Sequence, residues 1–152
     1  MRIVRARPDD ALVVAALSLQ ASIAMDGVRE DGYLARAAEH WLAHHPYLPA
    51  WFAEHDGEHA GLLQAAYPPE TTKPGQPPGS RGRLWVHLLF VHADHRRQGV
   101  GAALLAACED WAKGVGVSVI RLRAGAGAED FYDATGYTVA TEVREKRLRP
   151  LR

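Results

Sequence analysis

Residues 96–103 read RRQGVGAA, and this stretch decides the fold. A nearly unbroken apolar run, Leu84 to Val91, precedes it, and an amphipathic segment from Val100 to Trp111 follows it. A continuous apolar run is typical of a strand covered on both faces, whereas an apolar stripe at intervals of three and four residues is typical of a helix. The sequence therefore predicts a buried strand that enters a helix through a basic turn containing glycine.

Such a turn is suited to binding an anion. The first turn of a helix leaves its backbone N–H groups unpaired, and the helix dipole places about half a positive charge there. Gly99 and Gly101 allow a phosphate to approach the backbone closely, and Arg96 and Arg97 add charge beside it. The stretch is not a Walker loop, because no lysine or hydroxyl residue follows Gly101, and it is not a Rossmann fingerprint, because Leu104 stands where the third glycine is needed.

The rest of the chain alternates strand and helix patterns. We expect strands over Arg2 to Arg7, Ala50 to His55, His59 to Tyr67, Leu84 to Val91, Val117 to Arg123 and, as one or two closing strands, Tyr137 to Leu148. Two helices are expected before Ala50, the second from Asp31 to His45, and a short one over Ala128 to Thr135. This order predicts a single α/β (α+β) domain over residues 1–152 with a mixed sheet. The segment rich in proline and glycine at 68–83 is expected to be a loop, either a lid or a solvated insertion.

Composition excludes several classes of protein. Apolar residues make up 47% of the 152 residues and charged residues 24%, which argues against a disordered chain or a fibre. The 18 basic and 18 acidic residues cancel, so a broad basic field for nucleic acid is not expected. The single cysteine, Cys108, favours a reducing compartment. With no apolar run long enough to span a membrane and no signal-like start over Met1 to Arg7, we expect a cytoplasmic protein without nucleic-acid or membrane partners.

Two motifs carry a family resemblance. Arg96-x-x-Gly99-x-Gly101, placed after Leu89-Phe90-Val91 and before Ala103-Leu104-Leu105, resembles the acetyl-CoA signature of the GNAT acetyltransferase superfamily. About 30 residues downstream, as in that family, residues 131–137 (FYDATGY) are similar to its Phe-Tyr-x-x-x-Gly-Phe/Tyr segment. The resemblance implies the GNAT fold, a mixed and mostly antiparallel sheet of six to seven strands flanked by about four helices and splayed where the acyl-CoA binds.

The resemblance also implies a function. It predicts an N-acetyltransferase that moves an acetyl group from acetyl-CoA to a primary amine of a small molecule or peptide by direct attack. The residues expected to bind the cofactor are Leu89, Phe90, Val91, Arg96, Arg97, Gln98, Gly99, Val100, Gly101 and Ala102. Two alternatives stay open: a CoA-binding sensor or scaffold domain without turnover, and an acyltransferase for a longer acyl-CoA. The identity of the amine is open, and homodimers, common in the family, are compatible with the chain.

Two residues are expected to move protons. Tyr132 matches the tyrosine that lies near the CoA sulfur in the family, and we expect it to be the general acid. His87 stands on the strand before the signature, where many relatives carry a glutamate, and its imidazole titrates near neutral pH. We expect His87 to be the base, with Glu30, Asp31, Glu54 or water as alternatives. Gly125 stands where relatives often carry an asparagine, so the contact that this side chain makes to the cofactor is either absent or replaced by the backbone.

The eight histidines raise the question of a metal site. His92-x-Asp94-His95 resembles half of a metallohydrolase signature, but Phe90 stands where the preceding His-x-His pair would need a histidine. The turn that holds these residues is already used by the acetyl-CoA signature, so we expect no metal. Three aromatic residues are candidates either for the acceptor pocket or for the core: Trp41, Tyr47 and Trp51.

Overall fold

The computed structural model describes residues 1–67, 82–140 and 144–148. Its strands are β1 (Arg2–Arg5), β2 (Ala50–His55), β3 (Glu58–Ala66), β4 (Arg83–Val91) and β5 (Val119–Leu122). Its α-helices are α1 (Ala11–Asp26), α2 (Tyr33–His44), α3 (Val100–Gly114) and α4 (Glu129–Ala134). Short 3-10 turns cover Pro8–Asp10 (η1), His45–Tyr47 (η2) and Ala93–His95 (η3).

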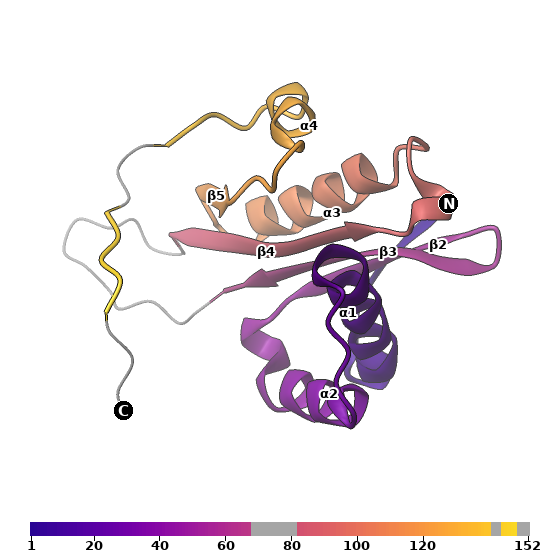
Figure 1. The fold of residues 1–152 in the computed structure, drawn as a ribbon. Helices are drawn as coiled ribbons and strands as arrows, with labels where there is room; N and C mark the ends of the chain where they lie inside the picture. The colour runs from indigo at the N-terminus through magenta and orange to yellow at the C-terminus, as the bar shows by residue number, and fades with distance from the viewer. Residues whose placement is uncertain (68–81, 141–143, 149–152) are drawn as a thin grey trace.

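One mixed sheet organises these elements in the order β1-β2-β3-β4-β5. Neighbours from β1 to β4 are antiparallel, and β5 is parallel to β4. The parallel connection requires a crossover, which α3 supplies. Helix α3 therefore covers one face of the sheet, and α1 and α2 cover the other (Figure 1).

Each face of the sheet has its own core. The face under α3 buries Leu84 of β4 against Leu104 and Cys108 of α3, each fully shielded from solvent. On the other face Val14 of α1 and Trp41 of α2 pack with the inner side chains of β2 and β3. Truncating a side chain as enclosed as Leu104 to alanine typically costs about 2–5 kcal/mol of stability, so both helical layers are held mainly by apolar burial.

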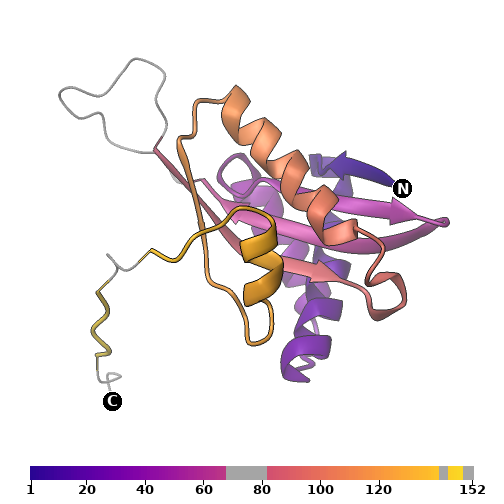
Figure 2. The same cartoon turned by 90° about the horizontal axis from the view of Figure 1, so that it is seen from above.

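Strand β5 is shorter than β4 and pairs with only the first part of it. Their pairing runs from Arg83 to Val86 of β4 and stops where Val86 meets Leu122. Strand β4 continues five residues further, to Val91, beside β3 alone. Figure 2 shows the chain after β5 turning away from β4 toward α4. Among the described residues no strand therefore lies on the β5 side of β4 from His87 to Val91, and this backbone edge of β4 is open where the splay was expected.

A β-bulge in β4 lies at the start of this open edge. Gln64 of β3 pairs with Leu88, whereas the next residue, Ala65, pairs with Val86. His87 is the extra residue, without a partner in the ladder. A bulge bends the strand and redirects the side chain it contains. As a result Val86 and Leu89, three residues apart, both pack on the core under α3, while His87 faces the opposite side.

The expected six to seven strands are wrong for the part of the chain that the structure describes, which forms five. The difference lies in the segment from Tyr137 to Leu148, because residues 137–140 and 144–148 are not strand and residues 141–143 lie outside the described ranges. The side chains from 144 to 148 are exposed, and four of these five residues are charged, so pairing them would bury little apolar surface. Of the loop expected at 68–83, residues 68–81 lie outside the described residues, and Arg83 already belongs to β4.

Among the helices that the structure describes, none combines the length and the apolar character needed to cross a lipid bilayer.

Candidate active site

The turn into α3 and the first residues of that helix, 96–102, have a backbone geometry suited to binding an anion. We call this segment the anion cradle. Arg97 and Gly99 both adopt left-handed backbone conformations, with φ of 60° and 78°, and Gly99 is the N-cap of α3. The first hydrogen bond of the helix runs from the N–H of Ala103 to the carbonyl of Gly99 (3.0 Å). The N–H groups of the residues between them therefore point out of the helix start, where negative charge is stabilised. Val100, Gly101 and Ala102 thus lie where the sequence predicts phosphate-binding amides.

Side chains on both sides fix the position of this turn. The Arg96 guanidinium donates from Nε to the carbonyl of Val91 (3.2 Å). Gln98 Oε1 lies 2.7 Å from His55 Nε2, at the end of β2. The turn is thus tied to the strand before it and to the β2–β3 hairpin. Because Val91 already accepts this bond from Arg96, its carbonyl is less free for a ligand than the sequence suggests.

The open edge of β4 lies beside the cradle. Leu89 and Val91 pack their side chains on the core under α3, and Phe90, 3% exposed, is buried. The three residues therefore offer a ligand backbone groups rather than side chains. An extended chain laid along this edge would continue the sheet past the end of β5.

Helix α4 brings Tyr132 to the same end of the sheet. A Cβ atom added to Gly101 would lie 3.4 Å from the Phe131 ring, so α4 packs closely on the first turn of α3. Tyr132 is partly buried and stacks edge-on against Phe131 and Tyr137. Burial raises the pKa of the Tyr132 phenol above its ordinary value of 10. The hydroxyl thus keeps its proton at neutral pH, as a general acid must.

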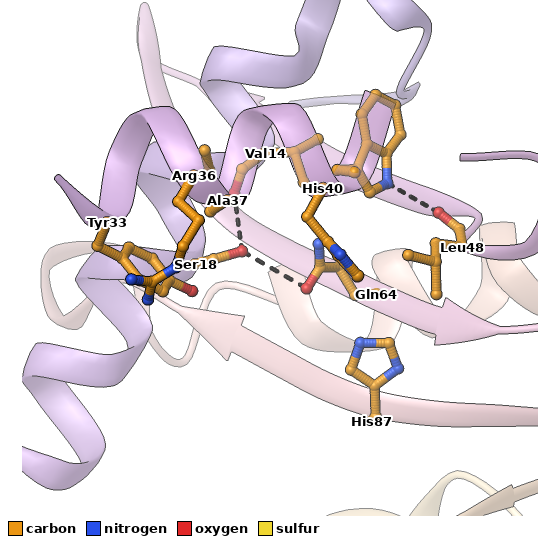
Figure 3. Close-up of a pocket in the computed structure, with 11 residues that line it drawn as sticks. Val14, Ser18, Tyr33, Arg36, Ala37, His40, Leu48, Gln64 and His87 are labelled. Atoms are coloured by element: carbon orange, nitrogen blue, oxygen red, sulfur yellow. Dashed lines mark hydrogen bonds between the residues drawn. The ribbon is translucent and has the colours of Figure 1, made fainter. Parts of the chain in front are cut away.

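A pocket of about 360 Å³ opens on the other face of the sheet, between α1, α2, β3 and β4 (Figure 3). The described residues that line it are Val14, Ala15, Ser18, Tyr33, Arg36, Ala37, His40, Trp41, Leu48, Gln64 and His87. Ser18 Oγ donates to the carbonyl of Val14 (2.8 Å) and lies 3.5 Å from Gln64 Oε1. The Trp41 indole donates to the carbonyl of Leu48 (2.9 Å), which holds its ring as a wall.

His87 belongs to this pocket. Its ring points from β4 toward the space beneath His40 and Gln64 (Figure 3). Solvent reaches the side chain, yet the surrounding protein removes enough water to lower the pKa of the imidazole below its ordinary value of 6.5. A lowered pKa leaves the ring neutral at pH 7, so it is able to accept a proton.

The two predicted proton-transfer residues lie on opposite faces of the sheet. His87 faces the pocket, and Tyr132 packs against the core under α3. Of the alternative bases, Glu54 forms an ion pair with Arg2 (2.8 Å) and Glu30 binds Arg36 through both carboxylate oxygens. Neither carboxylate lines the pocket, and Asp31 does not line it either.

The aromatic candidates divide between pocket and core. Trp41 lines the pocket, whereas Trp51 is buried under α3 and lies edge-on to Trp111, with 5.5 Å between the ring centroids. Tyr47 is exposed outside the pocket. Cys108 is fully buried, which raises the pKa of its thiol to about 12 and leaves it unreactive as a nucleophile.

Sequence reasoning missed most of the polar groups in the pocket. Ser18, Arg36, His40 and Gln64 come from three separate elements, α1, α2 and β3. No motif joins them, and only the helical spacing of Arg36 and His40 gives any local signal.

Comparison with known proteins identifies a family for this chain. The acetyltransferase (GNAT) family matches residues 16–137. No curated protein matches the sequence.

Solved structures share the fold along nearly the whole chain. An aminoglycoside N-acetyltransferase in complex with CoA is 20% identical, with 98% of this chain and 95% of that chain covered and a TM-score of 0.72. An aminoglycoside acetyltransferase from an uncultured soil metagenomic sample, in complex with trehalose, is 18% identical, with 99% and 96% covered and a TM-score of 0.74. A ribosomal-protein-alanine N-acetyltransferase from Brucella melitensis biovar Abortus 2308 is 25% identical, with 97% and 98% covered and a TM-score of 0.71.

The family match spans most of the chain, including the turn at 96–99, the open edge of β4 and α4. The chain therefore belongs to the GNAT acetyltransferase family and is an acyltransferase enzyme.

Proposed function

We propose that this protein transfers an acetyl group from acetyl-CoA to a primary amine held in the pocket between α1, α2 and the sheet. The observation that carries the proposal is the separation of β4 from β5 after Val86. The opening has an anion cradle beside it, at the start of α3, and a pocket on the other face of the sheet. An acyl donor and an acceptor entering from these two sides would meet at β4.

The proposed binding mode of acetyl-CoA follows from the groups on the α3 side. Its pyrophosphate would accept bonds from the N–H groups of Gln98 to Ala102, with Arg97 supplying charge. Its pantetheine arm would lie along the backbone edge from Leu89 to Val91. The left-handed backbone at Arg97 and Gly99 supports this fit, because it turns successive N–H groups toward one concave side.

The proposed reaction is a direct attack of the amine on the thioester carbonyl. A lysine-like amine has a pKa of about 10, so at pH 7 it reaches the pocket mostly as an ammonium. His87, neutral at pH 7, would take that proton directly or through one water. The C–N bond forms as the C–S bond breaks, and Tyr132 would give its proton to the leaving thiolate, so the products are an amide and free CoA.

The pocket favours a particular class of amine. Its described lining residues include no carboxylate, and Glu30, which lies beside the lining residue Arg36, is already bound to that guanidinium through both oxygens. A polycation such as an aminoglycoside, on which two of the structural neighbours act, would meet no compensating negative charge there. We therefore assign an uncharged, aromatic or apolar body to the acceptor, with a single reactive amine that enters between Tyr33, His40 and Trp41.

Calorimetric titration tests the donor. Acetyl-CoA should bind with a micromolar Kd, and ATP and NAD, which share its phosphates but not its pantetheine arm, should bind more weakly. Propionyl-CoA and succinyl-CoA in the same titration test the preference for acetyl over longer acyl groups. The absence of acetyl-CoA binding at millimolar concentration would overturn the proposal.

Thiol release tests the acceptor. Arylalkylamines should stimulate release of free CoA from acetyl-CoA, and a polycationic aminoglycoside should stimulate it at least about tenfold less, a difference of about 1.4 kcal/mol. Faster turnover of the aminoglycoside would overturn the assignment of the acceptor class while leaving the acetyl-CoA assignment intact.

A further inference from the structure

Three side chains of types that bind metals meet at the tip of the β2–β3 hairpin, and none of them lines the pocket. His55 and Asp56 come from the end of β2 and the turn after it, and His95 comes from η3. One ligand atom from each, a ring nitrogen or a carboxylate oxygen, lies within 4.8 Å of the other two. The hairpin and the turn before α3 lie at the same end of the sheet in Figures 1 and 2.

We propose that these three residues bind a transition-metal dication such as Zn²⁺. Two imidazoles and a carboxylate form a donor set that suits Zn²⁺, Co²⁺ or Ni²⁺, whereas Mg²⁺ and Ca²⁺ prefer ligands that are all oxygen. A fourth, tetrahedral position would be open to water or to a nearby carboxylate.

Unsatisfied nitrogen atoms in this cluster support the proposal independently. The His95 side chain is only 7% exposed, and its Nδ1 is buried with no hydrogen-bond partner among the described residues. The Nδ1 of His55 is buried and unpartnered in the same way. Buried polar atoms are nearly always paired with protein, water or an ion. Two unpaired imidazole nitrogens in one cluster therefore point to a partner that coordinates imidazole.

Neighbouring groups orient these ligands. Glu58 Oε2 lies 2.8 Å from His95 Nε2, the arrangement in which a carboxylate fixes the tautomer and the ring direction of a metal-binding histidine. Gln98 Oε1 lies 2.7 Å from His55 Nε2, which leaves Nδ1 as the free nitrogen of that ring, and a left-handed backbone conformation (φ 52°) holds Asp56 at the hairpin turn. Asp56 and Glu58 together supply two negative charges, which match a dication.

The site uses only one residue of the histidine motif noted in the sequence. His95 is a ligand, whereas His92 accepts a bond from the N–H of Asp94 (3.3 Å) and stays outside the group. The other two ligands stand about 40 residues earlier in the chain. The proposal therefore departs from the expectation of no metal, because the hairpin supplies the ligands that the motif lacks.

Titration of the untagged, chelator-treated chain tests the site. Zn²⁺ should bind with one equivalent and a Kd of about 1 μM, Co²⁺ should give the intense visible absorption of tetrahedral coordination, and Mg²⁺ should produce no heat. His95→Gln and His55→Gln should each weaken Zn²⁺ binding at least about tenfold, which is about 1.4 kcal/mol. His59→Gln is the matched control, because His59 lies in the same hairpin but is not one of the three proposed ligands. Its ring lies edge-on to Phe52, with 5.4 Å between the ring centroids.

A surface variant keeps the test decisive if a histidine variant does not fold. Asp56 is 80% exposed, and asparagine also tolerates its left-handed backbone, so Asp56→Asn should fold normally by circular dichroism and still bind Zn²⁺ more weakly. No Zn²⁺ binding below about 100 μM, or equal weakening by His59→Gln, would overturn the proposal.

Discussion

The two faces of the central sheet differ in how completely they are filled. Under α3, side chains such as Leu63, Leu84 and Leu104 leave no exposed surface. Under α1 and α2, the helices bury Val14 and Leu17 but leave a pocket of about 360 Å³ lined with polar groups. The filled face carries the turn that we assign to the donor, and the hollow face is the one that we assign to the acceptor. Donor binding thus depends on backbone held rigidly in place, and acceptor choice on side chains around an open space.

The largest expected effect is on the filled side. Gly101→Glu should weaken acetyl-CoA binding about 1000-fold, or about 4 kcal/mol, because it brings negative charge to the start of α3, where we place the pyrophosphate, and adds bulk against the Phe131 ring of α4. Gly99→Glu should do the same, although its left-handed backbone adds strain. Gly114→Glu, at the other end of α3 with nothing within 4 Å of its added Cβ, is the control and should bind acetyl-CoA normally in calorimetry. Unchanged affinity in both of the first two variants would show that the cofactor binds elsewhere.

Removal of the proposed acid should lower turnover next most strongly. Tyr132→Phe keeps the ring that packs against Phe131 but removes the proton donor, so kcat should fall about 100-fold with acetyl-CoA affinity preserved. Because the pKa of Tyr132 is raised above 10, this group should cause no loss of wild-type activity below pH 10. A kcat equal to that of the wild type would exclude Tyr132 as the acid.

On the hollow side, His87→Gln should lower kcat/KM for the amine about 30-fold near pH 7, less than the loss at Tyr132 because water in the open pocket can replace the base. The wild-type rate should fall as the pH drops through the pKa of His87, which lies below 6.5, because protonation removes the accepting lone pair. The ratio of wild-type to variant rates should shrink at alkaline pH, where the amine is already deprotonated. Parallel pH profiles for the two proteins would exclude His87 as the base.

The smallest expected effects are on the free energy of unfolding, and a matched pair of variants compares the two faces directly. Ala65→Leu adds three carbon atoms to the fully enclosed core under α3 and should lower the free energy of unfolding by about 1–3 kcal/mol. Ala37→Leu adds the same atoms at the pocket wall, should change stability by less than about 0.5 kcal/mol, and should raise KM for the amine. Urea unfolding measures the first difference and steady-state kinetics the second. Equal destabilisation by both variants would mean that the pocket is not open space.

Much of the filled face could be predicted from the sequence. The apolar run that became β4 and the turn that became the start of α3 are neighbours in the chain, so local patterns describe them. Helix α4 lies within the short helix predicted over Ala128 to Thr135 from the local pattern. The closing strands over Tyr137 to Leu148 were wrong in the described residues, because alternation of side chains indicates a strand but does not provide a neighbour to pair with.

The hollow face could be predicted much less well. Tyr33, Arg36 and His40 recur at helical spacing, but that spacing cannot show that they face Gln64 and His87 across a cavity. The bulge places both His87 and Leu88 on the face toward α1 and α2, and nothing in the apolar run from Leu84 to Val91 marks where an extra residue is inserted. The cluster of His55 and His95 likewise depends on which hairpin lies beside which turn. Long-range contacts of this kind follow from topology rather than from local pattern.

The bulge at His87 has a consequence for how such a site is gained or lost in evolution. In regular alternation, Leu84, Val86, Leu88 and Phe90 would share one face, but the extra residue shifts the alternation by one position partway along β4. Substitution at position 87 changes the chemistry of the side chain but keeps this shift. Deletion of that single codon would remove the bulge and join Val86 to Leu88 in regular alternation, so both halves of the strand would keep their facing. Gain or loss of one codon is therefore enough to add or remove a side chain at this wall of the pocket while the other residues of β4 keep their facing.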